Sequence, residues 1–171
     1  MSASVLLPVT LAMLGAAAVM TMQAKPTPPG QSPKRKDKLV LTGEQWRDRL
    51  TPEQFRILRA QGTERAFCGA FYDNKKTGTY SCVGCDLPVF RSDAKFDSGT
   101  GWPSFFQPAT PDAIWTRQDL GYGMVREEVL CARCDGHLGH VFNDGPKPSG
   151  LRFCINSEVL TFREEEPGKG H

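Results

Sequence analysis

This 171-residue sequence has little net charge and only three histidines. The 21 basic and 19 acidic residues leave a formal charge of only +2, which argues against a protein that binds nucleic acid through bulk positive charge. Low-complexity sequence is confined to the N-terminal region, so long disordered tracts are excluded from the remainder. With 39% hydrophobic residues, the chain can bury a core without relying on disulfide bonds.

Residues 1–24 contain no charged side chain, and residues 5–20 form an apolar run rich in alanine. A run of this length is typical of an export signal and marginal for a membrane span. Basic residues follow the run instead of preceding it, which is unusual for a signal because positive charge tends to remain cytoplasmic. The segment is therefore predicted to be a signal peptide or an N-terminal membrane anchor, with cleavage left open. It contains no cysteine, which excludes a lipoprotein anchor.

The expected location is therefore exported, either periplasmic or secreted, or membrane-anchored, with the side of the membrane undecided. Residues 25–38 are rich in proline and lysine and are predicted to be a solvated linker. The basic run at 34–36 would also allow a membrane tether through anionic lipid, although the solvated linker is the favoured interpretation. Residues 39–165 are predicted to form the folded domain, and residues 166–171 a flexible tail.

Two short helices are predicted at the start of the domain. Thr42 and Gln45 have the spacing of a capping box, and Thr51 and Gln54 repeat it with a proline in the first turn. Gly62 is expected to end the second helix. Beyond it, residues 79–83, 124–130 and 151–156 resemble strands separated by turn residues, which favours a mainly β domain with antiparallel sheets.

Four of the six cysteines form two C-x-x-C pairs, Cys82 with Cys85 and Cys131 with Cys134. Two such turns can direct four thiolates at one cation, which predicts a structural zinc site with no open position for catalysis. The pairs are 45 residues apart, so the metal would join distant parts of one domain. The alternative is two redox pairs or two disulfides, but a C-x-x-C disulfide closes only a small loop and stabilises little.

Cys154 is the candidate nucleophile among the two remaining cysteines. In a strand, Arg152, Cys154 and Asn156 would lie on one polar face, with Phe153 and Ile155 buried on the other. The neighbouring arginine is expected to lower the pKa of the thiol and enrich the reactive thiolate. An inert cysteine in the core is the alternative.

Two histidines and two aromatic residues complete the candidate site. His137 and His140 lie three residues apart, directly after the second cysteine pair. From a tight loop or a helical turn they could act as ligands of a second metal or as a general acid or base, or they could be ordinary core histidines. Trp102 and Phe105, in a glycine-rich segment, would line an apolar pocket or be buried beside a turn.

Four segments together resemble the B-type peptide-methionine (R)-S-oxide reductases: Cys82–Cys85, Lys95–Phe105, Cys131–Phe142 and Arg152–Ser157. The resemblance covers residues 42–162. It implies two antiparallel sheets in a tent-like arrangement with short N-terminal helices and a zinc clip. It also implies an oxidoreductase that reduces the R epimer of methionine sulfoxide, in oxidised proteins or as the free amino acid.

The resemblance also implies roles for individual residues. Cys154 would be the nucleophile, and the four paired cysteines would bind zinc. Trp102 would pack on the substrate methyl group. Three further residues would orient the sulfoxide and protonate its oxygen: His140 as the first choice of acid, His137 as the second, and Asn156. Phe105 and Arg152 complete the expected substrate contacts.

One position departs from the family pattern. Many members carry a second catalytic cysteine in the glycine-rich segment, where this chain has Thr100. Cys68 is the one spare thiol, so we expect a Cys68–Cys154 disulfide to form after Cys154 has become a sulfenic acid, and a thioredoxin-like dithiol to reduce it. An exported protein would need such a reductant outside the cytoplasm, in a compartment hostile to free thiols.

Two other classes of function remain open from the sequence. A zinc-knuckle module that binds nucleic acid or protein would explain the four cysteines but not the polar strand around Cys154. An exported disulfide scaffold without activity would use all six cysteines and hold no metal.

Overall fold

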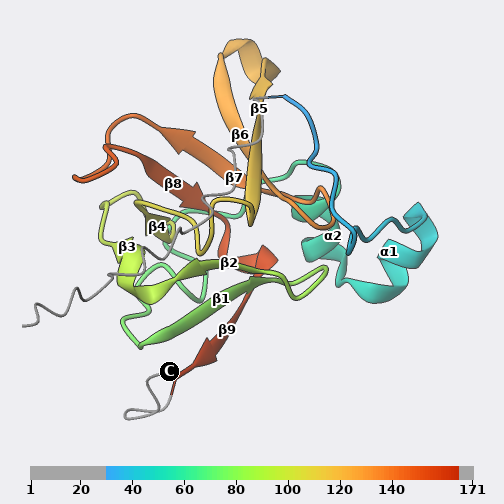
Figure 1. Ribbon diagram of the computed structural model, residues 1–171, viewed down its shortest axis with the longest axis horizontal. Helices are drawn as coiled ribbons and strands as arrows, with labels where there is room; N and C mark the ends of the chain where they lie inside the picture. The colour runs from blue at the N-terminus through green and yellow to red at the C-terminus, as the bar shows by residue number, and fades with distance from the viewer. Residues whose placement is uncertain (1–29, 166–171) are drawn as a thin grey trace, which may run out of the picture.

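The computed structural model describes residues 30–165, apart from the side chain of Tyr122 (Figure 1). The predictions for residues 1–24 and 166–171 lie outside the described residues. Within the described part, no helix is long and apolar enough to cross a membrane. Residues 30–38 contain no helix or strand, but Gly30 donates to the carbonyl of Thr116 and Lys38 pairs with Asp135 at 2.7 Å. The described part of the predicted linker therefore lies against the domain.

Both predicted helices are present and begin where the capping boxes indicate. α1 spans Gly43–Arg49 and α2 spans Pro52–Leu58. The Thr42 hydroxyl accepts from the Gln45 amide at 3.2 Å, and the Gln45 side chain accepts from the Thr42 amide in return. The prediction that α2 continues to Gly62 is wrong. The chain turns after Leu58 so tightly that the Gly62 amide donates to the Arg56 carbonyl.

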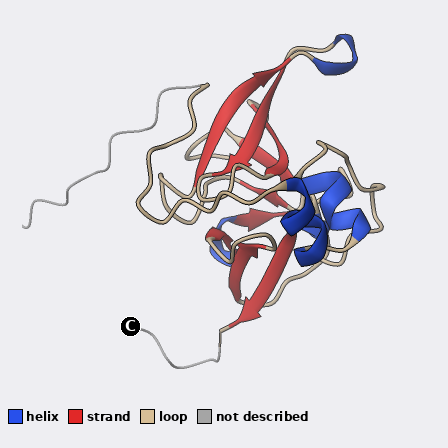
Figure 2. Ribbon diagram, turned by 90° about the vertical axis from the view of Figure 1, so that its right-hand side faces the viewer, coloured by secondary structure: helices blue, strands red, loops and turns tan. Residues whose placement is uncertain are grey.

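Two antiparallel sheets make up most of the domain, which confirms the predicted fold class. The first has the order β2-β1-β9, and the second β3-β4-β8-β7-β6-β5. Figure 2 shows the two sheets one above the other, with both helices on one side. The strands are β1 Gly78–Cys82, β2 Pro88–Arg91, β3 Lys95–Phe96, β4 Ser104–Phe105, β5 Ile114–Asp119, β6 Arg126–Cys131, β7 His137–Phe142, β8 Arg152–Ile155 and β9 Leu160–Glu164. Three 3₁₀ turns connect them: η1 Ser92–Ala94, η2 Gly121–Gly123 and η3 Ser157–Val159.

The two histidines lie on a strand, β7, rather than in a loop or a helical turn. Residues three apart in a regular strand point to opposite faces. In β7, however, Gly139 pairs with Val129 and His137 with Leu130, so Leu138 is an extra residue in a β-bulge. The bulge restores a common face for His137 and His140. Their ring centroids are 5.4 Å apart.

A cluster of aromatic rings fills the core between the sheets. Phe105 stacks on Phe90 with ring centroids 4.5 Å apart and meets Tyr80 edge-on at 5.2 Å. All three side chains are fully buried. Phe153 of β8 also packs on Phe90, with ring centroids 5.8 Å apart. Side chains of β1, β2, β4 and β8 therefore hold the two sheets together.

We expect Phe105→Ala to lower the free energy of unfolding by about 3–5 kcal/mol, because it empties a buried aromatic site. Chemical denaturation followed by circular dichroism measures the change. Val40→Ala is the control, since Val40 is 82% exposed and contributes little to the core. A loss below about 1 kcal/mol for Phe105→Ala would contradict this account of the core.

Candidate active site and metal centre

The four paired cysteines meet at one buried point, as predicted. Cys82 ends β1 and Cys131 ends β6, so the cluster joins the two sheets. All four sulfur atoms lie within 4.8 Å of one another. The Sγ atoms of Cys82 and Cys134 are 3.7 Å apart, and those of Cys85 and Cys131 are 3.4 Å apart.

The two cysteine turns have the same backbone geometry. The Asp86 amide donates to the Cys82 carbonyl at 2.8 Å, and the Asp135 amide donates to the Cys131 carbonyl at 2.9 Å. Both aspartates adopt positive φ, +58° and +55°, a conformation that aspartate tolerates better than most residues. Each C-x-x-C turn is therefore closed in the same way and presents two sulfurs to the shared centre.

Helix packing leaves no room for side chains beside these turns. A Cβ on Gly84 would lie 2.7 Å from the Leu58 side chain, and a Cβ on Gly136 would lie 2.6 Å from it. Glycine at both positions lets α2 cover the two turns and exclude water from the sulfurs. α2 therefore also shields the metal centre.

The residues fit a zinc ion. Tetrahedral zinc with sulfur ligands at about 2.3 Å separates the sulfurs by about 3.8 Å, close to the spacing of the clustered thiols. Four thiolates complete the tetrahedron, so the site is closed and serves structure, as predicted. The metal would hold the end of β1 against the end of β6.

The candidate nucleophile lies in the middle of the larger sheet. Cys154 of β8 pairs with Ser104 of β4 on one side and with His140 of β7 on the other. Its side chain opens into a cavity of about 140 Å³. The cavity is lined by Thr63, Trp102, Arg126, Gly139, His140, Phe142, Cys154, Ile155 and Asn156. Trp102, His140, Cys154 and Asn156 are therefore brought together as the sequence predicted.

Phe105 is not part of this cavity, and the prediction that it contacts substrate is wrong. Phe105 pairs with Phe153, one residue before Cys154, and successive residues of a strand face opposite sides of the sheet. Cys154 therefore points to the cavity, while Phe153 and Phe105 point into the core. The glycine-rich segment contributes Trp102 to the site and Phe105 to the core.

Arg152 shares the face of Cys154 but does not line the cavity. Its guanidinium donates twice to Asp144, each time at 2.9 Å, and lies 4.5 Å from the ring centre of Phe142. The prediction that the pKa of Cys154 is depressed is wrong, although Arg152 acts in the predicted direction. Burial raises the pKa of the Cys154 thiol, and the charge of Arg152 offsets this only in part.

A carboxylate that the sequence reasoning missed holds His140. Asp119, the last residue of β5, accepts from His140 Nε2 at 2.8 Å and from Arg126 at 2.7 Å. The Gly121 amide also donates to it. These bonds, led by that of Gly121, lower the pKa of Asp119 to about 2, so it is ionised. Burial lowers the pKa of His140, and the bond to Asp119 acts against that shift.

A second missed carboxylate holds His137. Glu128 is fully buried and accepts from His137 Nδ1 at 2.8 Å, from Arg117 at 2.6 Å and from Gln61. Burial raises the pKa of Glu128, but these three bonds outweigh it and bring the pKa to about 2. His137 Nε2 is buried and has no partner among the described residues. The ring lies in a wider cavity of about 440 Å³ that also contains His140.

Glu64 organises the loop that covers the site. Its carboxylate accepts from the amides of Ser157 and Glu158, at 2.7 and 2.8 Å, at the start of η3. Its own amide donates to the Asn156 side chain, and its carbonyl accepts from the Trp102 indole at 3.3 Å. Asn156 also donates to the carbonyl of Leu138. Two of the predicted site residues are therefore fixed by one glutamate in the loop.

Cys68 lies exposed on the same loop. The preceding residue, Phe67, has φ of +64° and donates its amide to the carbonyl of Gly101 at 2.8 Å. The residue before Gly101 is Thr100, whose hydroxyl is 4.0 Å from the Cys154 sulfur. Phe67, next to Cys68 in the sequence, therefore contacts the segment whose Thr100 side chain lies beside Cys154.

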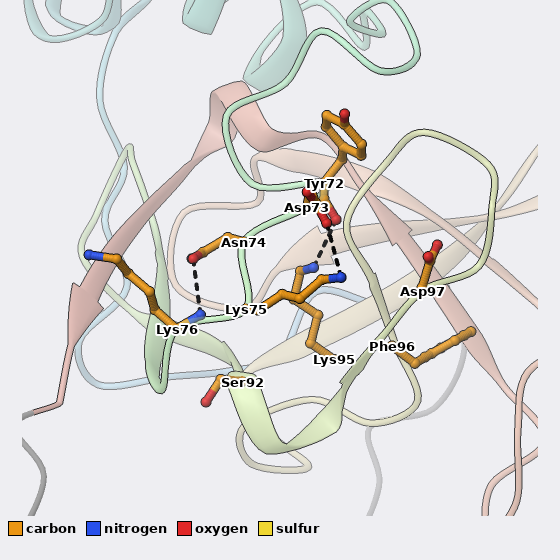
Figure 3. Close-up of a pocket in the computed structure, with 9 residues that line it drawn as sticks. All are labelled: Tyr72, Asp73, Asn74, Lys75, Lys76, Ser92, Lys95, Phe96 and Asp97. Atoms are coloured by element: carbon orange, nitrogen blue, oxygen red, sulfur yellow. Dashed lines mark hydrogen bonds and ion pairs between the residues drawn. The ribbon is translucent and has the colours of Figure 1, made fainter.

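A separate cavity of about 250 Å³ lies between residues 72–76 and the segment around Lys95 (Figure 3). Lys75 pairs with Asp73 at 3.3 Å, and the Lys95 ammonium donates to the carbonyl of Tyr72. Burial lowers the pKa of Lys95. The cavity contains none of the residues predicted for the site, and its lysines are bonded within the protein.

Of the carboxylates that the sequence analysis missed, only Glu128 could have been found from a sequence pattern. Arg126 and Glu128 lie two residues apart in a predicted strand and therefore share a face. Asp119 and Glu64 had no such signal, because their roles depend on the pairing of β5 with β6 and on the path of a loop.

We expect Cys131→Ser to abolish zinc binding and to lower the melting temperature by roughly 10 °C or more, because each kcal/mol lost costs about 2–4 °C at this size. Atomic emission measures the metal and circular dichroism the melting. Cys68→Ser removes an exposed cysteine outside the cluster and is the matched control, expected to retain metal and stability. Zinc retained by Cys131→Ser would overturn the assignment.

Comparison with known proteins identifies the family to which this chain belongs. The SelR domain model matches residues 50–164. A protein of Synechococcus sp. (strain RCC307) named peptide methionine sulfoxide reductase MsrB is 56% identical over 129 residues, which cover 75% of this chain and 95% of that protein. Proteins of the same name from Thiobacillus denitrificans and Azotobacter vinelandii are 57% and 54% identical, over 73% and 77% of this chain and 95% and 99% of theirs. The resemblance inferred from the four motifs is confirmed, and the chain belongs to the SelR-domain family of peptide methionine sulfoxide reductases.

Proposed function

We propose that this protein reduces methionine-R-sulfoxide, in oxidised proteins or as the free amino acid, to methionine, with Cys154 as the nucleophile. The observation that carries the proposal is the pairing of Cys154 with His140 at a small cavity that also contains Trp102. The cavity offers a nucleophilic sulfur, a group able to deliver a proton and an apolar ring for the substrate methyl. The family membership of the chain supports the same reaction.

In the first step the Cys154 sulfur attacks the sulfur of the sulfoxide. The oxygen ends on Cys154 as a sulfenic acid, methionine leaves, and its sulfur gains the two electrons that Cys154 loses. No net proton is consumed, because the thiol proton reappears on the sulfenic acid. The raised pKa of Cys154 keeps its thiol protonated in the resting enzyme. This proton is therefore available when the sulfoxide oxygen accumulates charge.

His140 is the proposed acid for that oxygen, and His137 the second choice. An unprotonated sulfoxide oxygen is a poor leaving group, so a proton donor within reach lowers the barrier. The ionised Asp119 stabilises a positive charge on His140 and fixes the ring. Asn156, held by Glu64 and Leu138, would orient the substrate at the cavity wall.

We propose that Cys68 resolves the sulfenic acid. Its thiolate attacks the Cys154 sulfur, water leaves, and a Cys68–Cys154 disulfide forms, which a thioredoxin-like dithiol then reduces. The contacts from Phe67 to Gly101 and from Thr100 to Cys154 support this pairing. The other four cysteines would hold zinc and so would not compete.

Zinc held by Cys82, Cys85, Cys131 and Cys134 would supply structure and no chemistry at Cys154. We also propose, from the apolar run alone, that residues 1–24 act as an export signal or a membrane anchor for a domain at 39–165. That arrangement would require the dithiol reductant to be present in the same compartment as the domain.

A stereospecific turnover assay tests the proposed function. The full chain receives separated R and S epimers of a methionine sulfoxide peptide, with dithiothreitol as the reductant. We expect consumption of the R epimer alone and complete loss with Cys154→Ser. Turnover of the S epimer, or activity retained by Cys154→Ser, contradicts the proposal. No turnover in protein that holds zinc would favour the zinc-knuckle binding module instead.

Asp119→Asn tests the role of His140. Loss of the carboxylate lowers the pKa of His140, since Asp119 opposes the effect of burial. His140 then loses its proton at a lower pH. The alkaline limb of the plot of kcat against pH should therefore shift to lower pH. We expect kcat to fall about tenfold at about pH 8 and less at about pH 6. Asp48→Asn on the exposed face of α1 is the control, and identical pH profiles for the two variants would contradict the assignment.

The route of resolution is tested by moving the second thiol. With a thioredoxin as the reductant, Cys68→Ser should slow turnover by roughly tenfold or more and leave a Cys154 sulfenic acid, detected by mass spectrometry. Adding Thr100→Cys should restore turnover, because this position lies 4.0 Å from the Cys154 sulfur. Full turnover by Cys68→Ser alone would show that Cys68 is not the resolving thiol.

A further inference from the structure

The hairpin of β5 and β6 projects from the body of the domain, and its turn exposes apolar side chains (Figure 1). We call residues 120–125 the hairpin tip. Leu120, Met124 and Val125 are 65%, 47% and 74% exposed, and they are half of the large hydrophobic residues that the described part of the chain exposes. The sequence of the hairpin tip contains no charged residue. Apolar side chains gathered in this way on one projection mark an interaction surface.

The charges at the base of the hairpin tip neutralise each other. Asp119 precedes the tip and Arg126 follows it, and their side chains form an ion pair at 2.7 Å. The same two residues face each other in the register of β5 and β6. An apolar tip above a neutralised pair can leave water without the cost of desolvating an unpaired charge.

The N-terminal part of the described chain runs along the free edge of β5 toward the hairpin tip. β5 is the outermost strand of the larger sheet. The Arg35 guanidinium donates to the carbonyl of Asp112, just before β5, and the Gly30 amide donates to the carbonyl of Thr116, in the middle of the strand. Followed from residue 35 back to residue 30, the chain therefore advances along β5 in the direction of the tip.

The length of chain that precedes the described part allows the uncharged N-terminal segment to begin at the tip. A strand advances about 3.3 Å per residue, so Leu120 lies about 13 Å beyond Thr116. A stretch as long as residues 25–29 spans at most about 17 Å. Residues 1–24 can therefore leave the domain at the end that carries the hairpin tip.

A lipid bilayer fits the hairpin tip better than a protein partner does. A stable protein interface covers about 800 Å² on each partner, and three side chains fall well short of that area. A bilayer requires no complementary shape, and a few inserted apolar side chains add to any other attachment of the same chain. We propose that the hairpin tip inserts into the bilayer to which residues 1–24 attach the chain. The inference goes beyond the proposed reaction and rests on the anchor, one of the two roles proposed for residues 1–24.

Insertion of the hairpin tip would also orient the active site. Asp119, directly before the tip, accepts from His140 Nε2 at 2.8 Å, and the amide of Gly121 within the tip donates to the same carboxylate. His140 lines the cavity of Cys154. The inserted tip would therefore hold this cavity close to the membrane surface.

Fluorescence quenching in the full chain tests whether the tip enters the bilayer. Met124→Trp adds a tryptophan in the tip, and Val40→Trp, the control, adds one at an exposed position just before α1. The unchanged chain gives the background of its three native tryptophans. The vesicles contain equal parts of phosphatidylcholine and phosphatidylglycerol with brominated acyl chains. We expect the added fluorescence of Met124→Trp to be quenched and to shift to shorter wavelength, and that of Val40→Trp to stay unchanged.

Two charged variants separate the hairpin tip from the anchor. Leu120→Asp with Val125→Asp opposes insertion of the tip, and Leu11→Asp with Leu14→Asp opposes insertion of the apolar N-terminal run. Flotation with the same vesicles measures how much of each full-length protein binds. We expect the tip variant to abolish the quenching of Met124→Trp, and the N-terminal variant to reduce the bound fraction.

The outcomes distinguish the tip from the anchor and from the reaction. A chain that floats with the vesicles without quenching of Met124→Trp overturns the inference and leaves the anchor standing. Quenching that persists when Leu11→Asp with Leu14→Asp leaves binding unchanged supports the tip and contradicts the anchor. A chain that binds no vesicles overturns both. Tip-dependent self-association in solution, without quenching, assigns the tip to a second copy and overturns the inference. The turnover assay decides the proposed reaction independently of all these results.

Discussion

Backbone pairing of β8 between β4 and β7 is the constraint on which the site depends. It places Cys154 opposite His140 and sends Phe153 and Phe105 to the other side of the sheet. A shift of one residue would turn the nucleophile into the core and a phenylalanine into the cavity. The stacking of Phe105 on Phe90 opposes such a shift, because the shift would break a contact between two fully buried rings of the two sheets. The same strand pairing therefore sets both the packing of the core and the geometry of the site.

Two carboxylates, the fully buried Glu128 and the partly exposed Asp119, give the histidines their orientation. Asp119 and Glu128 face the same side from neighbouring strands, and each accepts from one histidine and one arginine. A carboxylate buried among cationic partners stays ionised, so it can hold an imidazole and stabilise its positive charge. The bulge at Leu138 lets both rings reach this network. Burial also raises the pKa of the Cys154 thiol, and there the charge of Arg152 offsets it only in part, so the pKa stays raised.

The zinc centre and the covering loop define the rest of the site. The four cysteines join the end of β1 to the end of β6, the strand that also carries Glu128 and Arg126. Glu64 fixes the loop by capping η3 and by bonding Asn156, and it leaves Cys68 exposed a few residues later. The amide of Phe67, the residue before Cys68, donates to the carbonyl of Gly101, the residue after Thr100, and this contact supports the proposed resolving role of Cys68.

Local chemistry in the sequence by itself determined the helix starts, the two cysteine turns, the zinc assignment and the face that Arg152 and Cys154 share. Each depends on residues a few positions apart, through a capping box, a tight turn or the alternation of a strand. Tertiary structure alone decided that Phe105 belongs to the core, that Asp119 and Glu64 serve the site, and that the pKa of Cys154 rises. These depend on strand pairing, on a bulge and on burial, which arise from residues far apart in the chain and so leave no local pattern.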